Sequence, residues 1–369
     1  MKLKKNIVLS AILLLTVAGF VSASEITGDS LKETLGGVSI GGHIKMYMYD
    51  GTEGTHNGVK QQDNSSAGFG GHAFYLYVGK ELESWLRLDS QLEYEYTASA
   101  TPKLGSDITR GANTSAATDP LAKTTAIAQL FMTASLPHGI EMKVGSFNAM
   151  YSEYYARETW WSEQYHLNPG ICSLIALHDT GIELNKNFEF TGVSLPVYLS
   201  LLNGQQVADN NNDKMTLLHV APEFFHSALK IMGSYGVGKY DAADKYTATR
   251  TLIGAEYKIA QVRLSSEYST LTSQDKIAVG KDAVNQGYYV QGMYVFNDMW
   301  RAGINNSHAD NEAVATYREV WDTNTLLLDC FLTPSSSIIG QYTMAEGNRT
   351  NGSDKVKYNR FTLGWRTTF

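Results

Sequence analysis

Apolar and polar residues alternate with a period of two over much of the chain from residue 38 onward. The segment from Trp85 to Tyr96 shows this most clearly, because leucines and tyrosines alternate there with charged and amide side chains. Successive side chains of a β-strand point to opposite faces, so each such segment has one apolar and one polar face. A polar row of this kind does not suit a packed core, and it indicates strands whose second face meets water.

The pattern predicts an all-β protein of about 16 antiparallel strands. They are expected near residues 38–49, 71–80, 85–96, 125–136, 140–148, 180–190, 195–204, 214–221, 227–238, 249–259, 261–270, 285–296, 299–307, 322–332, 337–346 and 357–369. Short turns (137–139, 222–224, 334–337) alternate with long polar loops (50–70, 97–124, 149–179). A soluble sheet also shows alternation along each strand, but this asymmetry of the connections favours a transmembrane β-barrel with periplasmic turns and extracellular loops.

The N-terminus predicts export to the bacterial outer membrane. Three lysines precede an apolar run from Ile7 to Phe20, and small residues follow up to Ala23. This is the layout of a signal peptide, which we place at residues 1–23. Residues 24–37 then form a short periplasmic segment, and residues 38–369 form the barrel. No later stretch approaches the roughly 18 apolar residues of a membrane-spanning helix.

Composition agrees with many exposed strands: the chain has 22 Tyr, 33 Gly and only 7 Pro. Loss of three signal-peptide lysines changes the formal charge from −7 to about −10, and an acidic protein of this kind is not expected to bind nucleic acid. The two cysteines, Cys172 and Cys330, cannot form a disulfide framework. Cys330 is expected on the outward face and Cys172 in a loop, so we expect them not to pair.

The final strand, residues 357–369, alternates apolar and polar residues and ends in Phe369. It resembles the closing strand of bacterial outer-membrane β-barrels. Aromatic residues also fall near strand ends on the expected outward face, where outer-membrane barrels carry their aromatic girdles. These residues are Tyr94, Tyr96, Tyr235, Tyr257, Tyr268, Tyr288, Tyr294, Trp300, Tyr342 and Phe369.

The loop at residues 149–179 follows the fifth strand and is rich in Tyr and Trp. Exposure of so many aromatic side chains to water is unfavourable. In 16-stranded porins the loop after the fifth strand folds inward and narrows the pore, and this loop resembles that constriction loop. The resemblance implies that the pore constriction contains Glu153, Arg157, Glu158, Trp160, Trp161 and Glu163. The alternative is a surface loop packed on the barrel rim.

Basic residues on the inward faces are expected to form the wall opposite this loop. The predicted pore-wall residues are Lys45, Arg87, Glu93, Lys143, Arg263, Arg301 and Arg360. Carboxylates share these inner faces, so cross-strand ion pairs are expected to neutralise many of the charges. The negative total charge favours weak selectivity for cations.

Two motifs carry a more specific resemblance. Residues 143–147 (Lys-Val-Gly-Ser-Phe) look like the Gly-x-Phe step of the phosphate-selective and DcaP-like porins, and residues 178–184 followed by 198–204 are similar to that group's paired strands ending in Asn-Gly. The resemblance implies a homotrimer that imports anions or small organic acids. A dense arginine ladder is not evident in this chain, so phosphate specificity is not implied.

The sequence predicts no catalytic residues, no cofactor and no metal site. Its nine histidines lie outside Gly-x-Ser-x-Gly and His-Glu-x-x-His contexts, and His219 and His226 are expected at the surface beside a periplasmic turn. Residues 209–213 (Asp-Asn-Asn-Asn-Asp) have oxygen ligands at alternate positions but lack the glycine and the bidentate glutamate of a calcium loop.

The function that follows is an outer-membrane porin, embedded in lipid and lipopolysaccharide, through which ions and small hydrophilic solutes diffuse passively. Two alternatives remain open. One is a substrate-specific channel for an organic acid, anion or sugar, in which the aromatic residues of the loop stack on the solute. The other is a non-conducting barrel, either an adhesin or the sheath of an electron-transfer complex.

Overall fold

A computed structural model describes residues 38–56, 59–62, 68–97, 123–156, 172–175, 177–204, 212–239, 245–314, 317–349 and 354–368. The expected signal peptide, the segment 24–37 and the terminal Phe369 lie outside these ranges. Within them the chain forms one antiparallel sheet of 18 strands. The strands are β1 (Val38–His56), β2 (Val59–Gln62), β3 (Gly68–Glu83), β4 (Leu86–Thr97), β5 (Lys123–Leu136), β6 (Ile140–Asn148), β7 (His178–Phe190), β8 (Val193–Leu202), β9 (Met215–Val220), β10 (Glu223–Phe224), β11 (Leu229–Lys239), β12 (Thr247–Ile259), β13 (Val262–Ala278), β14 (Lys281–Val295), β15 (Trp300–Val314), β16 (Tyr317–Thr333), β17 (Ser336–Arg349) and β18 (Asp354–Thr368).

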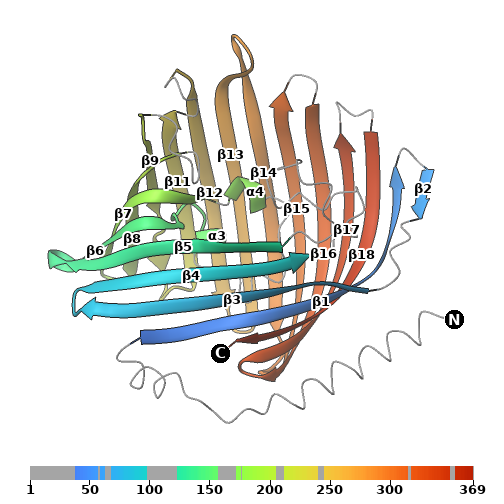
Figure 1. Cartoon of the computed structure of the whole chain (residues 1–369), viewed down its shortest axis with the longest axis horizontal. Helices are drawn as coiled ribbons and strands as arrows, with labels where there is room; N and C mark the ends of the chain where they lie inside the picture. The colour runs from blue at the N-terminus through green and yellow to red at the C-terminus, as the bar shows by residue number, and fades with distance from the viewer. Residues whose placement is uncertain are drawn as a thin grey trace.

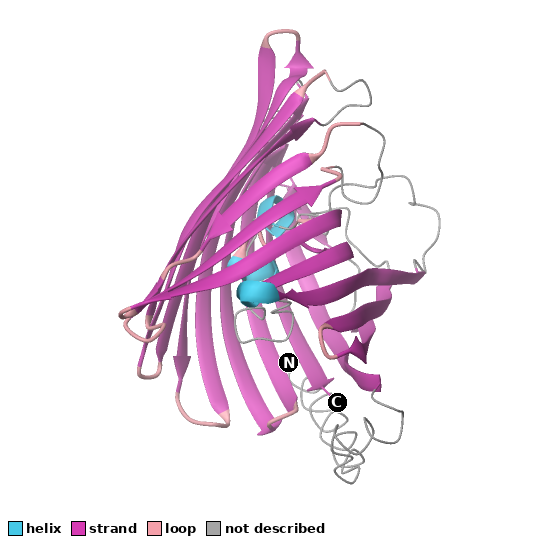
Figure 2. Cartoon of the chain, turned by 90° about the vertical axis from the view of Figure 1, so that its left-hand side faces the viewer, coloured by secondary structure: helices cyan, strands magenta, loops and turns pink. Residues whose placement is uncertain are grey.

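The sheet closes on itself, as Figures 1 and 2 show, because β1 pairs with β3 on one side and with β18 on the other. Among the described residues β2 pairs only with β1, and β9 and β10 occupy successive stretches between β8 and β11. If β2 is set aside and β9 and β10 are taken as one, the 18 strands fill 16 positions around the ring. Each of the 16 predicted strands corresponds to one of these positions.

Pro222 interrupts the strand that sequence analysis ended at residue 221. It has no amide hydrogen to donate to the sheet, yet its carbonyl accepts a hydrogen bond from Ile231 N at 3.1 Å. Pairing then resumes in β10, so residues 223–224 belong to the strand and not to the turn expected at 222–224. The turn itself follows, where Phe225, His226 and Ser227 have φ of 53°, 58° and 64°.

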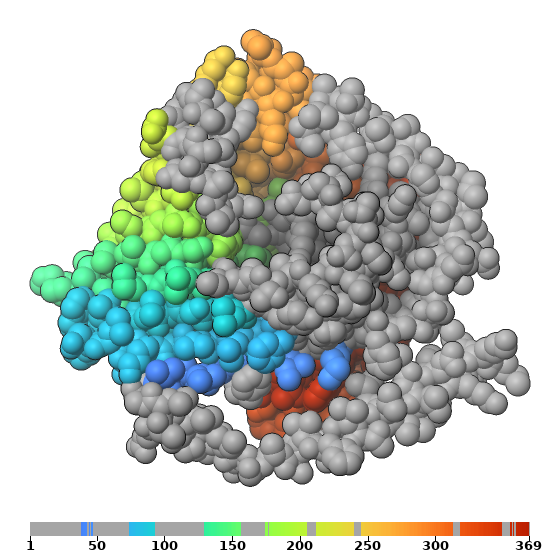
Figure 3. Space-filling model, viewed as in Figure 1, coloured from blue at the N-terminus to red at the C-terminus, as the bar shows by residue number. Residues whose placement is uncertain are grey.

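The connections differ at the two ends of the barrel, as predicted. Turns such as 191–192 and 334–335 join strands at the end that we identify as periplasmic. At the other end β13 and β14 extend beyond the strands predicted there and meet in a turn at Val279–Gly280. Their hairpin projects from the top of the barrel in Figures 1 and 3. Alternation continues above the membrane because an antiparallel ribbon still satisfies its backbone hydrogen bonds in water.

Burial is inverted relative to that of a soluble protein. Ile253, Val290 and Ile304 are 63%, 54% and 55% exposed, whereas the side chains of Glu183 and Asn305 are fully buried. Ile304 and Asn305 are neighbours, so β15 turns its apolar face outward and its polar face inward. This arrangement is stable only where lipid contacts the outer face. The chain is therefore a transmembrane antiparallel β-barrel, as predicted.

The outward face also carries the expected aromatic residues. The side chains of Tyr235, Tyr257, Tyr268, Tyr288, Tyr294, Trp300 and Tyr342 are all exposed. The side chains of Tyr94 and Tyr96 lie outside the described part. Cys330 is a free, half-buried thiol on β16 between inward-facing Asp329 and Phe331, which agrees with its predicted outward position.

Gly145, in the motif at 143–147, is required by close packing of the backbone. Its φ is +138°, and a Cβ atom there would lie 2.3 Å from the carbonyl oxygen of Leu130 on β5. Any larger residue would force β5 and β6 apart. The glycine therefore supports the wall from which the long loop departs.

The described helices are single turns: η1 (Pro137–Gly139), α3 (Glu153–Ala156) and α4 (Cys172–Ile175). In the part of the chain that the structure describes, no helix has the length and apolar character needed to cross a membrane.

Candidate functional site: the loop inside the barrel

The loop after β6 enters the barrel, as the resemblance to a constriction loop implied. In Figure 2 both α3 and α4 lie between the walls of the barrel. Residues 149–154 are all buried, and Ile175 is 0% exposed. The alternative of a loop on the barrel rim is thereby excluded for the described residues 149–156 and 172–175. Residues 157–171 and 176 lie outside the described part.

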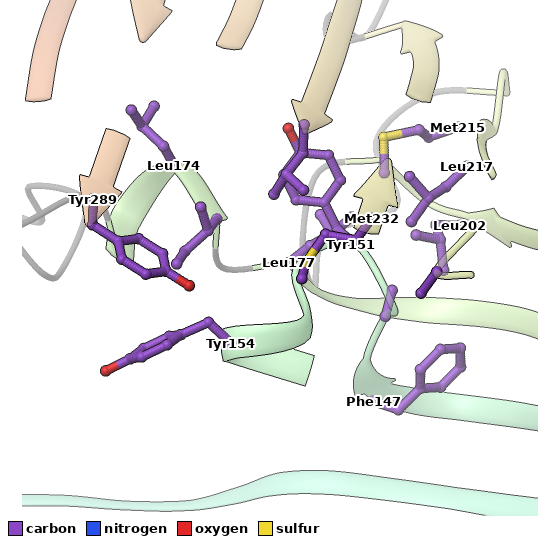
Figure 4. Close-up of a cluster of buried hydrophobic side chains, with 14 of the residues drawn as sticks. Phe147, Tyr151, Tyr154, Leu174, Leu177, Leu202, Met215, Leu217, Met232 and Tyr289 are labelled. Atoms are coloured by element: carbon purple, nitrogen blue, oxygen red, sulfur yellow. The ribbon is translucent and has the colours of Figure 1, made fainter. Parts of the chain in front are cut away.

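Apolar contacts hold the start of the loop against the opposite wall. Tyr151 lies in a cluster with Leu217 and Met232, which come from β9 and β11 (Figure 4). Tyr154 packs on Tyr289 of β14, with ring centroids 5.4 Å apart. Burial of large aromatic side chains contributes about 1.5–3 kcal/mol each, so these two tyrosines are the main apolar anchors of the loop.

Two carboxylates of the barrel wall receive hydrogen bonds from the loop. Glu267 of β13 accepts a hydrogen bond from Ser152 Oγ at 2.6 Å and one from the Tyr154 amide at 3.2 Å. Glu183 of β7 accepts one from the Met150 amide at 2.9 Å. Both carboxylates are buried, and hydrogen bonds to buried charged groups are about twice as strong as those between neutral groups. We call these three hydrogen bonds the carboxylate latch.

Tyr151 adds a neutral anchor. Its hydroxyl donates to the carbonyl of Thr251 at 2.8 Å and lies 2.8 Å from Ser269 Oγ. Ser234 Oγ donates in turn to the carbonyl of Tyr151 at 2.5 Å. Burial raises the pKa of the Tyr151 phenol to about 12, so this hydroxyl stays protonated, and able to donate, throughout the physiological range.

Glu153 is the one predicted constriction residue that the structure describes, and its position differs from the expectation. Its side chain is buried, 3.4 Å from Lys230 Nζ and 3.6 Å from His219 Nε2. The carboxylate thus contacts the barrel wall and does not face water at the narrowest point, because buried charges require partners. Arg157, Glu158, Trp160, Trp161 and Glu163 lie outside the described residues.

His219 also differs from its expected surface position. Its ring is fully buried, its Nδ1 lies 2.7 Å from Ser234 Oγ, and it packs edge-on against Tyr198. The alternation of β9 explains this, since Met215, Leu217 and His219 share the inward face. Sequence reasoning missed His219 because it treated the residue as part of a turn instead of extending the period of two.

The predicted pore-wall residues lie on several sides of the barrel. Lys143 of β6 faces Glu183 at 3.6 Å, the kind of cross-strand ion pair that was expected. Arg87 of β4 is half exposed and contacts Asp89 at 2.8 Å. The side chains of Lys45 and Glu93 lie outside the described part, although their backbones belong to β1 and β4.

Arg263, Arg301 and Arg360 occupy β13, β15 and β18. The first two approach each other across the inner wall, whereas Arg360 pairs in register with Thr343 of β17. In the described residues no group of three or more metal-ligating side chains could hold a metal ion.

No family model matches the chain, and no curated protein matches it. Solved structures do. The outer-membrane channel DcaP of Acinetobacter baumannii aligns over 90% of this chain and 97% of its own, at 12% identity and a TM-score of 0.59. A loop-deletion form of OmpT, an outer membrane protein of Vibrio cholerae, aligns over 90% and 99% at 12% identity and a TM-score of 0.56.

An anion-selective porin from Comamonas acidovorans is similar to the same extent, with 12% identity, 90% and 99% coverage and a TM-score of 0.55. At such identities the likeness concerns the fold alone. Together with the outward apolar face and the loop inside the barrel, it shows that this chain is a porin-like β-barrel of the bacterial outer membrane.

Proposed function

We propose that the protein is a porin through which ions and small hydrophilic solutes diffuse passively. The observation that carries this proposal is the inward row of polar side chains around a closed ring of 16 strand positions. A barrel of this size is too wide for its own side chains to fill. Polar side chains facing such an interior are solvated by a column of water.

The loop would narrow this column from one side. The loop hydrogen bonds described above go to β7, β11, β12 and β13, and the aromatic contact goes to β14. The pore would then lie between the loop and the remaining wall, which includes the inner faces of β15 to β18. The field between loop and wall would select ions by charge.

The trimeric state is part of the proposal and rests on likeness. One solved form of OmpT from Vibrio cholerae, similar to this chain at a TM-score of 0.54 and 12% identity, is a trimer. We propose the same state here, with lipid and lipopolysaccharide around the outward apolar surface. The signal peptide at residues 1–23 would direct the chain to this membrane.

The deciding experiment is a planar-bilayer recording of the purified mature protein under a KCl gradient. Large conductance steps in groups of three support a trimeric open porin. The net negative charge favours a reversal potential of the cation-selective sign. Folded, heat-modifiable protein that gives no conductance would refute the diffusion function and favour a plugged or adhesive barrel.

A further inference from the structure

Three arginines gather on the inner wall near the periplasmic end of the barrel. Arg263, Arg301 and Arg366 come from β13, β15 and β18 and all face inward. Arg301 lies close enough to both of the others for their like charges to repel. A fold that holds like charges together carries an electrostatic cost that a bound anion would relieve.

The aromatic ring of Phe331 organises this cluster. The Arg301 guanidinium lies 4.0 Å from the ring centroid and that of Arg366 lies 5.7 Å from it. Cation–π contacts of this kind fix the position of a guanidinium without using its N–H donors. Those donors therefore stay in the geometry suited to a carboxylate or phosphate.

One carboxylate shares the site. Asp329 pairs in register with Arg301 and interacts electrostatically with Arg301 and Arg366. Three guanidinium groups and one carboxylate leave a formal excess of two positive charges. Arg263 and Arg301 are half-buried and accessible from the lumen, whereas Arg366 is buried behind them.

An apolar patch lies directly beside the arginines. Met293 and Leu327 are buried on the inner wall, and Ile339 packs against them. Gly303 lies between the first two in register on β15 and adds no side chain to separate them. Apolar side chains facing inward are unusual in a barrel whose lumen is polar, so this patch is a second feature of the same wall that indicates a ligand.

We propose that Arg263, Arg301 and the patch of Met293, Leu327 and Ile339 bind organic anions that carry an apolar body and one anionic head. The head would be a carboxylate, a phosphate ester or a sulfonate held by the two accessible guanidinium groups. The apolar body would cover the patch. Because the protein as a whole is negative, small anions without such a body are bound weakly.

The site is separate from the loop. Glu267 of the carboxylate latch lies four residues from Arg263 on the same face of β13, which places it about 13 Å away along the strand. The anion site therefore lies on the periplasmic side of the loop anchor, at the inner mouth of the pore. This proposal rests on the porin function proposed above for its physiological role, but not for binding itself.

Benzoate is a suitable probe, with acetate (no ring) and benzyl alcohol (no charge) as matched compounds. Each is added to single channels in KCl, and the binding constant is taken from the frequency and length of current interruptions. Benzoate is expected to interrupt the current, and acetate and benzyl alcohol are expected to do so at least about tenfold less at equal concentration.

Arg263→Gln and Arg301→Gln are each expected to weaken benzoate binding by about five- to tenfold, the loss expected for one charge-assisted contact. Arg263→Lys retains the charge and should restore part of this loss. Lys357→Gln is the control, since Lys357 is exposed and pairs with Glu346 at 2.7 Å on the far part of β18. Equal benzoate interruption in wild type, Arg263→Gln and Arg301→Gln would overturn the proposal.

Failure of the porin function is measured separately. If the folded protein gives no conductance, the same variants are compared by equilibrium dialysis with radiolabelled benzoate. Benzoate binding that depends on Arg263 and Arg301 supports the anion site even where the porin function fails. Conductance with no arginine-dependent binding refutes the anion site and leaves the porin function intact.

Discussion

Removal of Glu267 should release the loop from the far wall of the barrel. This carboxylate accepts two of the three hydrogen bonds of the carboxylate latch, from Ser152 Oγ and from the Tyr154 amide. Hydrogen bonds to a charged group contribute about 1.5–3 kcal/mol each. Glu153 and Glu256 also lie near Glu267 and repel it, so its removal relieves some repulsion.

We therefore take the lower end of the range, about 3 kcal/mol for the two hydrogen bonds together. That free energy corresponds to a rise of roughly 150-fold in the population of the released loop. Single-channel recording of Glu267→Ala should show the consequence directly, as a noisier current with frequent excursions to a second conductance level. Ser152→Ala removes one of the two hydrogen bonds and should give an intermediate effect.

The control for Glu267→Ala is Glu141→Ala. Glu141 is a carboxylate of β6 that accepts a hydrogen bond from Asn185 at 3.0 Å, and its removal changes the charge of the protein by the same amount. If Glu267→Ala and Glu141→Ala, both heat-modifiable and folded, give the same current noise as the wild type, the latch does not hold the loop.

Three further predictions concern charge, ionisation and the lipid-facing surface. Joint neutralisation of Glu153, Glu158 and Glu163 to glutamine should shift the reversal potential in a KCl gradient towards anion selectivity, because the loop loses three negative charges. Tyr151 should make the loop anchor sensitive to strong base: its pKa is about 12 in the folded protein and about 10 when unfolded, so the stability that it contributes is present below pH 10. That contribution, about 2–3 kcal/mol, is lost as pH rises from 10 to 12, and current noise should rise over this interval. Ile253→Lys, at a side chain 63% exposed to lipid, should lower barrel stability in urea by about 2–4 kcal/mol.

Each of these predictions has a control. Neutralisation of Glu346, which lies exposed on β17 beside Lys357, should leave ion selectivity unchanged, and an unchanged potential in the triple variant would count against a constriction role for the loop charges. Tyr151→Phe should abolish the rise of noise between pH 10 and 12, whereas Tyr235→Phe, on the lipid face, should not. An Ile253→Lys barrel as stable as the wild type would mean that this face does not contact lipid.

The sequence by itself determined the architecture, because the alternation of a strand is a local property. Each pair of neighbouring residues in a segment such as 85–96 reports which face meets lipid and which meets water. For that reason the 16 strands, the outward tyrosines and the free Cys330 were all predicted without knowledge of any long-range contact. The aromatic content of residues 149–170 likewise indicated that this loop leaves the water.

Only the tertiary structure decided where the loop makes its contacts. Ser152 and Glu267 are 115 residues apart in the chain, and Lys230 lies 77 residues from Glu153. Closure of the ring brings these residues together, and no local period encodes which wall faces which loop. The same reason explains the burial of His219 and the meeting of Arg263 with Arg301, since each depends on the positions of several strands around the barrel.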